Sequence, residues 1–189
     1  MKILYIHGLA SSGASGTPAN LRSLLPDDVV ISPDLPLDPI EALNMLRDIC
    51  ASQNIDIVVG TSMGGMFAQQ MHGYRKIIIN PAFHVSQSMR KRLGKNKWFN
   101  PRQDGATTFT ITPELCDAYQ EMERHQFDGI TDFDCNNSVG LFGNADTTVN
   151  CREEFLDHYT DMRTFEGEHR LSFNDIRDII VPLIIKMAQ

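Results

Sequence analysis

The chain has 189 residues, of which 42% are hydrophobic and 22% charged, and its formal net charge is −7. This length suits one domain with a sizeable core, and the composition excludes a disordered chain. The acidic balance argues against nucleic acid or an anionic membrane surface as a partner.

Short apolar runs alternate with amphipathic segments along the chain, a pattern typical of β-α units around a mostly parallel sheet. Helices are expected to begin at Thr17-Pro18 and at Asp38-Pro39, because a capping side chain there precedes a proline suited to the first turn. A further helix is expected over about 63–72. The strands expected in this half of the chain are 3–6, 29–31, 55–59 and 76–80.

The segment 84–132 interrupts this alternation. It carries a basic run at 90–97 and a helix expected to begin at Thr112-Pro113. Connections longer than about 15 residues are usually functional or disordered, and aromatic residues in the segment argue against disorder. We therefore expect 84–132 to be a lid insertion that sets substrate choice, with an acyl pocket formed by its aromatic side chains Trp98, Phe99 and Phe109.

After the insertion the alternation resumes. Strands are expected at 139–142 and 162–165, with a helix between them that Asn150 caps. Ser172 and Asp175 form a capping box for the last helix, in which Pro182 should produce a kink. The sequence thus predicts a single α/β domain over residues 1–189. Its sheet should contain about six mostly parallel strands in the order 2-1-3-4-5-6, with helices on both faces.

Ser62 lies in the sequence Gly60-Thr61-Ser62-Met63-Gly64-Gly65, which follows an expected strand and precedes an expected helix. In this setting a G-x-S-x-G motif forms a nucleophile elbow. The tight turn that exposes the serine brings the flanking chain close to itself, so the positions two before and two after it need to be glycine. A glycine-rich turn that holds a serine by chance is the competing interpretation.

A serine hydroxyl needs a neighbouring base before it attacks a carbonyl carbon. The acid and the base follow the nucleophile along the chain in this kind of fold, each after a later strand. Asp146 lies in the loop after the fifth expected strand, and His169 lies in a glycine-containing loop after the sixth. We therefore predict Asp146 as the acid and His169 as the general base.

Other carboxylates and histidines are placed less well for these two roles. Asp134 precedes its strand, Asp157 and Asp161 flank a different helix end, and Glu168 is expected to be a solvated neighbour of the base. The competing histidines lie at a strand end, in helices or in the insertion; they are His7, His72, His84, His125 and His158.

An acyl-transfer site also needs two backbone N–H donors that bind the oxyanion. The residue after the nucleophile, Met63, supplies one of them. We assign the other to Leu9, in the loop that begins with His7-Gly8 after the first expected strand. The competing interpretation of that loop is a flexible surface turn.

The His7-Gly8 loop, the Ser62 motif, the turn at 143–146 and the late Gly167-Glu168-His169 together resemble the α/β-hydrolase superfamily. Tyr5-Ile6-His7-Gly8, Asn80-Pro81-Ala82 and the short chain resemble, more narrowly, the small YqiA-like bacterial esterases. The resemblance implies a compact α/β-hydrolase fold with esterase or thioesterase activity. It also implies a catalytic triad of Ser62, Asp146 and His169. Glu168 departs from the small residue or Asn that often precedes the His in these enzymes.

We expect a serine carboxylesterase or thioesterase that forms an acyl-enzyme and needs neither a metal nor an organic cofactor. Its substrate is expected to be a small-molecule acyl ester or thioester. A non-catalytic ligand-binding protein on the same fold is the alternative, because fold does not fix function. An amide hydrolase is a further possibility, because it would use the same triad. The basic run at 90–97 is either a solvated face or a site for an anionic carrier such as the phosphates of coenzyme A.

The four cysteines form no C-x-x-C pair and no Cys/His cluster with zinc spacing, which favours free thiols in a reducing compartment. The apolar run after Lys2 is shorter than the core of a signal peptide. No apolar run reaches the roughly 18 residues of a membrane span. These features predict a cytoplasmic protein.

Overall fold

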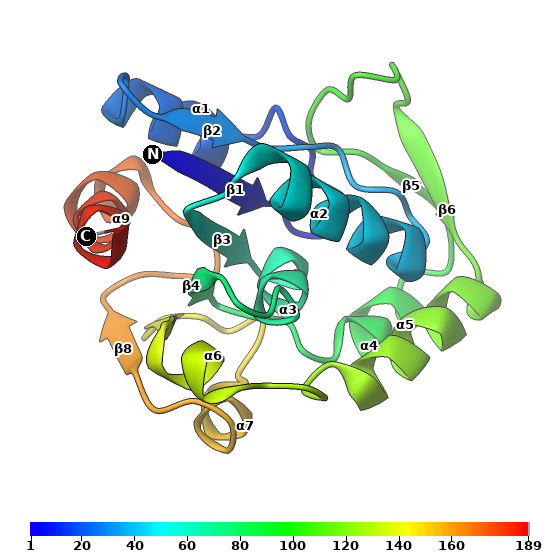
Figure 1. Cartoon of the computed structure of the whole chain (residues 1–189). Coiled ribbons are helices and arrows are strands. Elements are labelled where there is room, and N and C mark those ends of the chain that lie inside the picture. Colours follow the sequence, from blue (N-terminus) through cyan, green and yellow to red (C-terminus); the bar gives the residue numbers. More distant parts are fainter. Residues whose placement is uncertain (189) are drawn as a thin grey trace.

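A six-stranded sheet forms the centre of the molecule in the computed structural model, which describes residues 1–188 (Figure 1). All of its strands are parallel, and they lie in the order β2-β1-β3-β4-β7-β8. Counted along the chain, this is the predicted order 2-1-3-4-5-6, so the predicted fold class is confirmed. The strands are β1 (Lys2–Ile6), β2 (Val29–Ile31), β3 (Ile57–Thr61), β4 (Arg75–Ile79), β7 (Ser138–Gly143) and β8 (Met162–Phe165).

Helices cover both faces of this sheet, as Figure 1 shows. The helices outside the insertion are α1 (Gly16–Leu24), α2 (Pro39–Gln53), α3 (Met63–Gln69), α7 (Arg152–Leu156), α8 (Phe173–Asp175) and α9 (Val181–Ala188). A π-helical turn, η1 (Ile176–Ile180), joins α8 to α9.

Two apolar cores result, because each strand sends alternate side chains to opposite faces of the sheet. Ile3 and Tyr5 of β1 pack on one face with residues of α1, η1 and α9. Leu4 and Ile6 pack on the other face with residues of α2, α3 and the insertion. The strands are buried on both faces, which is why they read as continuous apolar runs in the sequence.

Three of the predicted helix starts agree with the structure. Asp38 caps α2 by accepting hydrogen bonds from the backbone N–H groups of Ile40 and Glu41. Thr112 caps the insertion's long helix by accepting from the N–H of Leu115. Ser172 and Asp175 form the predicted capping box at α8.

Two other local predictions were wrong. Helix α1 begins at Gly16, so Thr17 lies inside the first turn, where a following proline is still tolerated because these N–H groups have no intrahelical partner. Helix α7 has Cys151 at its cap position, because the turn that Asp146 organises carries the chain past Asn150. Pro182 lies in the first turn of α9, directly after the π-helical turn η1, and the kink expected there stays a prediction.

The insertion contains a hairpin that the sequence analysis did not predict. Its elements are α4 (Val85–Arg90), β5 (Gly94–Lys97), β6 (Thr108–Ile111) and α5 (Pro113–His125), and α6 (Asp132–Asn136) follows at its end. Strands β5 and β6 pair antiparallel as a separate two-stranded sheet. Glu123 of α5 ties the helices together by accepting hydrogen bonds from the N–H and hydroxyl of Ser86 in α4, at 2.7 and 2.6 Å.

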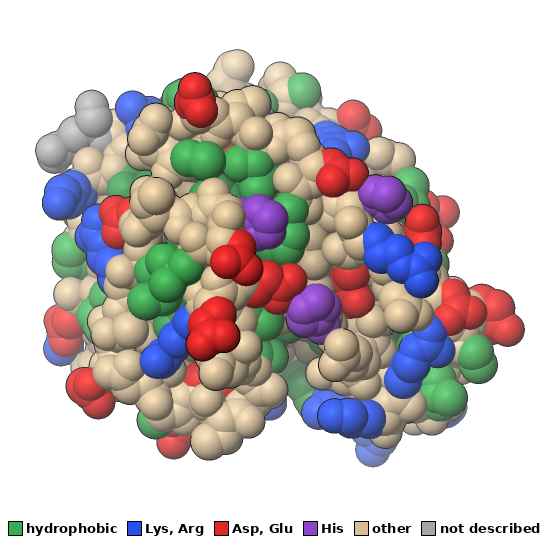
Figure 2. Space-filling model, turned by 90° about the horizontal axis from the view of Figure 1, so that it is seen from below, with side chains coloured by type: hydrophobic (Ala, Val, Ile, Leu, Met, Phe, Trp, Pro, Cys, Tyr) green, Lys and Arg blue, Asp and Glu red, His purple; other side chains and the backbone are tan. Residues whose placement is uncertain are grey.

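On the face shown in Figure 2, acidic and basic side chains are interspersed. Many of its Lys and Arg side chains lie on the right-hand part, which Figure 1 shows to be the side of the insertion. The four cysteines are free thiols. Within residues 1–188, the model contains no helix with the length and apolar character that crossing a bilayer requires.

Candidate active site

Ser62 occupies the turn between β3 and α3, with φ 57° and ψ −122°. A positive φ is unfavourable for any residue other than glycine, and such strain clusters at functional sites. The glycines on either side permit the turn. A Cβ on Gly60 would collide with the carbonyl oxygen of Gly64, and a Cβ on Gly64 would collide with the carbonyl oxygen of Ile6. The tight turn therefore has the steric basis that the G-x-S-x-G pattern indicates.

The structure brings Ser62, His169 and Asp146 together in a hydrogen-bonded chain. The Nε2 atom of His169 lies 3.0 Å from the hydroxyl oxygen of Ser62, and its Nδ1 atom lies 2.7 Å from Oδ2 of Asp146. The imidazole is 19% exposed and the carboxylate 4% exposed. The imidazole of His169 is thus partly accessible from outside, while the carboxylate of Asp146 is shielded from water.

Backbone hydrogen bonds hold the acid and its loop in place. The second carboxylate oxygen of Asp146 accepts from the N–H groups of Thr148 and Val149, at 2.7 and 3.2 Å. The N–H of Ala145 donates to the carbonyl of Gly167 at 2.9 Å. The loop after β7, which carries the acid, is therefore bonded directly to the loop after β8, which carries the histidine.

The loop after β1 lies against the serine. A Cβ on Gly8 would be 3.2 Å from Cβ of Ser62, so the chain at Gly8-Leu9 passes directly beside the nucleophile. Met63 is the first residue of α3, where backbone N–H groups have no intrahelical partner. The two N–H groups that the sequence analysis singled out, those of Leu9 and Met63, thus belong to the two segments that flank the serine hydroxyl.

His7 holds the loop after β1 in place. Its Nε2 atom accepts the backbone N–H of Leu35 at 3.2 Å, so the proton of the neutral ring is on Nδ1, which donates to the carbonyl of Gly8 at 2.9 Å. Burial lowers the pKa of His7 and keeps the ring neutral, although the bond to Gly8 acts in the opposite direction. No pattern in the sequence predicted that the His7 ring holds this loop.

The remaining histidines have partners in other parts of the molecule. His72 lies 3.4 Å from Asp134, His84 lies 2.9 Å from Glu154, and His125 lies 2.9 Å from Asp128. His158 stacks on Phe127 with 3.9 Å between ring centroids. The side chain of Glu168 is exposed, as expected. His169 is the histidine that meets a serine and a carboxylate together.

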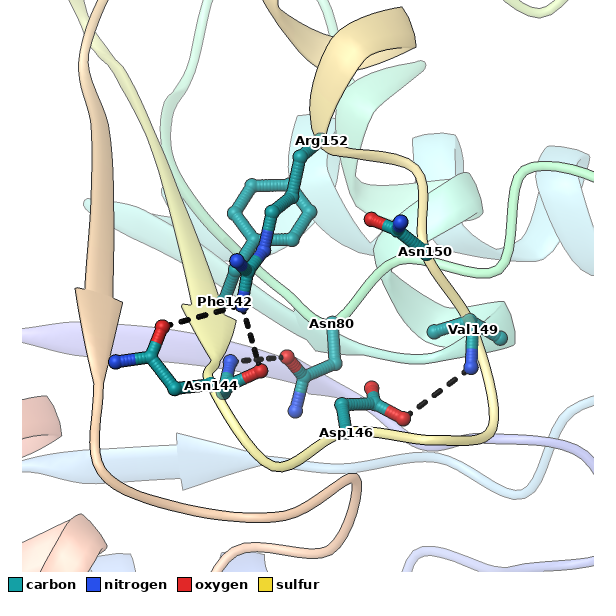
Figure 3. A pocket seen from close by; sticks show the side chains of 8 residues that line it. Asn80, Phe142, Asn144, Asp146, Val149, Asn150 and Arg152 are labelled. Carbon is teal, nitrogen blue, oxygen red and sulfur yellow. Dashed lines mark hydrogen bonds between the residues drawn. The ribbon is translucent and has the colours of Figure 1, made fainter.

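One cavity adjoins Asp146, and a second is lined by Leu9 of the loop after β1. The smaller, of about 160 Å³, lies beside the acid and is lined by Asn80, Asp146, Val149, Asn150 and Arg152 among others (Figure 3). The larger, of about 270 Å³, lies between the loop after β1 and the hairpin of the insertion. Its walls include Leu9, Phe99, Phe109 and Ile111, with Arg92 and Lys97 beside them. Across residues 1–188 there is no cluster of three or more His, Cys, Asp or Glu side chains suited to a metal ion.

Solved structures share this architecture. Est1E from Butyrivibrio proteoclasticus has a TM-score of 0.67 at 14% identity, covering 98% of this chain and 87% of that one. A monoacylglycerol lipase from Paleococcus ferrophilus has a TM-score of 0.66 at 12% identity, covering 99% and 93%. A thioesterase domain from the curacin biosynthetic pathway has a TM-score of 0.58 at 11% identity, covering 100% and 91%. The protein has the α/β-hydrolase fold.

A family model narrows this class. Residues 2–133 match the family described as "Uncharacterised protein family (UPF0227)", and the chain belongs to that family. The match confirms the resemblance to the YqiA-like proteins that the motifs indicated. It includes Ser62 and the loop after β1, whereas Asp146 and His169 lie beyond it. No curated protein matches the chain.

Proposed function

We propose that the protein is a serine hydrolase that cleaves carboxylic esters or thioesters through an acyl-enzyme intermediate. The observation that carries this proposal is the continuous chain of two hydrogen bonds, of 3.0 and 2.7 Å, from Ser62 through His169 to Asp146. A hydroxyl placed on a neutral imidazole, itself oriented by a buried carboxylate, is the arrangement that activates a serine.

In the proposed reaction, the hydroxyl oxygen of Ser62 attacks the carbonyl carbon while its proton passes to Nε2 of His169. The N–H groups of Leu9 and Met63 bind the negative oxygen of the tetrahedral intermediate. The intermediate collapses, and the departing alcohol or thiol takes the proton from His169. A water molecule then gives a proton to His169 and attacks the acyl carbon. As this second tetrahedral intermediate collapses, the bond to Ser62 breaks and the Ser62 oxygen takes the proton back from His169, which releases the acid and restores the enzyme. Asp146 keeps the imidazole in the required tautomer throughout.

The names of proteins with the same fold support an ester or thioester over other scissile bonds, because they include a lipase, a methylesterase and a thioesterase domain. The alternative is a binding protein that keeps the fold without catalysis. That alternative gives no reason for a serine in a strained backbone conformation with a base 3.0 Å away.

A fluorophosphonate probe tests the proposal, because only an activated serine attacks phosphorus quickly. The protein should be labelled once, at Ser62, as located by peptide mass spectrometry. Labelling should disappear in Ser62→Ala and persist in Ser52→Ala, which changes an exposed serine of α2 whose hydroxyl donates to the carbonyl of Asp48. An unlabelled wild-type protein, or a labelled Ser62→Ala, would reject the proposed function and favour a binding protein.

We further propose that the protein is a single domain and that the insertion 84–132 is its lid. The expected range of the domain, 1–189, includes residue 189, which lies outside the described residues. Two hydrogen bonds join the segment between β5 and β6 to the loop after β1. The N–H of Phe99 donates to the carbonyl of Ala10 at 2.8 Å, and the hydroxyl of Ser12 donates to the carbonyl of Pro101 at 2.7 Å. The guanidinium of Arg170, next to His169, lies 5.5 Å from the ring centroid of Phe99.

The cavity under the hairpin supports a role in substrate choice. Its apolar walls suit an acyl chain, and Arg92 and Lys97 are placed to meet a negative charge on the substrate or its carrier. Arg90, in the same basic run, is instead paired with Asp117 at 2.5 Å on the surface of α5. The basic run therefore contains residues that line the cavity, Arg92 and Lys97, and a residue that is paired elsewhere, Arg90. Substitutions at the two kinds of position can be compared directly.

The double variant Arg92→Gln/Lys97→Gln should raise KM for an acyl-CoA and leave KM unchanged for an uncharged ester of the same acyl chain. Arg90→Gln serves as the control and should change neither. Equal effects on both substrates, or no effect on either, would reject the carrier proposal. A substitution of Phe109 by alanine that leaves chain-length preference unchanged would reject the acyl pocket.

A further inference from the structure

The chain at the end of β4 contacts the nucleophile from two sides. The backbone N–H of Ser62 donates to the carbonyl of Ile79 at 3.0 Å, and the N–H of Ala82 donates to the carbonyl of Ser62 at 3.0 Å. The strained backbone at Ser62 is thus held between two hydrogen bonds from one short segment. This segment, residues 79–82, begins at the last residue of β4, which pairs with β3, the strand that Ser62 follows.

The side chain of Asn80 reaches from this segment to the other two site loops. Its amide nitrogen donates to the carbonyls of Glu168 and His169, at 3.1 and 3.2 Å. Its amide oxygen accepts the backbone N–H of Gly143 at 2.8 Å, at the end of the strand that leads to Asp146. Figure 3 shows the Asn80 side chain directed at the turn after β7, beside the carboxylate of Asp146.

The backbone and the surroundings of Asn80 restrict which residue fits there. Its φ is +42°, a left-handed conformation that asparagine tolerates better than most side chains, and the residue is 1% exposed. A buried amide needs partners for both its donor and its acceptor. Glycine would adopt the same backbone conformation without the bonds, and aspartate would keep the acceptor and lose the donors.

We propose that Asn80 is a positioning residue for the active site: it fixes the loops of His169 and Asp146 relative to the strand segment that holds Ser62. This inference rests on the proposed function. Its physical basis is that a single buried amide, on a segment bonded to the nucleophile, makes three hydrogen bonds to the two loops that carry the base and the acid. A shift of about 1 Å in such an arrangement costs roughly 100-fold in rate.

Two variants separate the amide group from the backbone conformation. Asn80→Gly keeps the left-handed backbone and removes all three side-chain bonds. Asn80→Asp keeps the acceptor for Gly143 and places a second oxygen against the carbonyls of Glu168 and His169, which repels them. The matched control is Asn54→Gly, because Asn54 is also an asparagine at positive φ, 51°, but lies exposed at the end of α2.

The readouts are the rate of fluorophosphonate labelling at Ser62, kcat and KM for a short ester, and the low-field proton resonance of His169 Nδ1–H. In both Asn80 variants, labelling and kcat should fall about 10- to 100-fold with little change in KM, and the resonance should shift or broaden. Asn54→Gly should match the wild type in all three. A purely structural role would lower the melting temperature without moving the resonance or kcat at 25 °C.

Wild-type rates and an unchanged resonance in either Asn80 variant that retains the native circular dichroism spectrum would overturn the inference. So would loss of native structure in both variants, because the role would then be structural. These failures are distinct from failure of the proposed function. If the wild-type protein is itself not labelled at Ser62, the proposed function fails; if the wild type is labelled and the Asn80 variants are labelled equally fast, only the positioning role fails.

Discussion

Gly8 and Ser62 lie close together just beyond the ends of two neighbouring strands: a Cβ on Gly8 would lie 3.2 Å from Cβ of Ser62 and 3.7 Å from its hydroxyl oxygen. The loop after β1, in which Leu9 is the proposed oxyanion donor, therefore lies directly beside the proposed nucleophile. A side chain at Gly8 cannot be accommodated unless one of the two segments moves by a few tenths of an ångström.

Gly8→Ala should accordingly lower kcat about tenfold or more, because the proposed oxyanion donor Leu9 and Ser62 would move apart while the remainder of the fold stays unchanged. Steady-state kinetics with an activated ester measures this, and urea unfolding checks stability. Gly16→Ala is the control, since a Cβ on Gly16 meets no atom within 4 Å. If Gly8→Ala were fully active, the contact between the two segments would not set the oxyanion site.

Asp146→Asn should reduce kcat by about 10³–10⁴-fold, the loss seen when the acid of a serine-protease triad is changed in this way. The amide cannot hold the imidazole in the tautomer whose Nε2 accepts the serine proton. Asp157→Asn, on an exposed residue at the end of α7, should retain wild-type turnover. Near wild-type activity of Asp146→Asn would mean that a different carboxylate orients His169.

The buried neutral His7 should make the fold less stable in mild acid. Burial lowers its pKa below the ordinary value of 6.5; nearby Asp34 opposes this effect, and nearby Arg102 adds to it. Above pH 6.5 neither state binds the proton. Below it the unfolded chain gains a proton that the folded protein does not bind, so the free energy of unfolding falls as the pH falls toward the lowered pKa.

Urea midpoints at pH 7.5 and pH 5.5 measure this effect. The decrease between the two should be smaller in His7→Gln than in the wild type. His125→Gln should change it in the opposite direction, because a hydrogen bond to Asp128 raises the pKa of His125 and makes its protonation favour the folded state. An equal decrease of the urea midpoint in wild type and His7→Gln would show that the pKa of His7 is not lowered in the folded protein.

Removing either partner of the buried pair Lys76–Asp134 should lower the free energy of unfolding. Both side chains are fully buried, and Nζ of Lys76 lies 2.6 Å from Oδ1 of Asp134. Burial tends to raise the pKa of Asp134, but hydrogen bonds from Lys76 and Thr131 outweigh it and hold the pKa well below its usual range. The carboxylate is therefore charged at neutral pH and needs its partner.

Lys76→Met should lower the free energy of unfolding by about 3–5 kcal/mol, because it leaves a buried carboxylate without its partner. Arg177→Met, which breaks the exposed pair with Asp178, should cost less than about 1 kcal/mol. Urea denaturation of both variants gives the comparison. Similar losses in the two variants would mean that burial does not govern the contribution of the Lys76–Asp134 pair.

Local patterns in the sequence determined much of this structure. Apolar runs and capping residues give the six strands and the helix starts at Asp38, Thr112 and Ser172, because these features depend on contacts within a few residues. The spacing around Ser62 gives the tight turn for the same reason. The strand order follows instead from the rules that govern connections between parallel strands. The predicted nucleophile, acid and base lie in loops at the same edge of the sheet, since all parallel strands end there.

Only the tertiary structure decided the relationships between residues far apart in the chain. The polar strand β5 has no apolar alternation, so its hairpin follows from pairing with β6. The basic run divides into Arg90, paired with Asp117, and Arg92, which lines a cavity, because the fold and not the sequence chooses their neighbours. Asn80 meets Glu168 across 88 residues of chain, and no local pattern encodes such a contact. Long-range hydrogen bonds of this kind arise only once the sheet has brought its strand ends together.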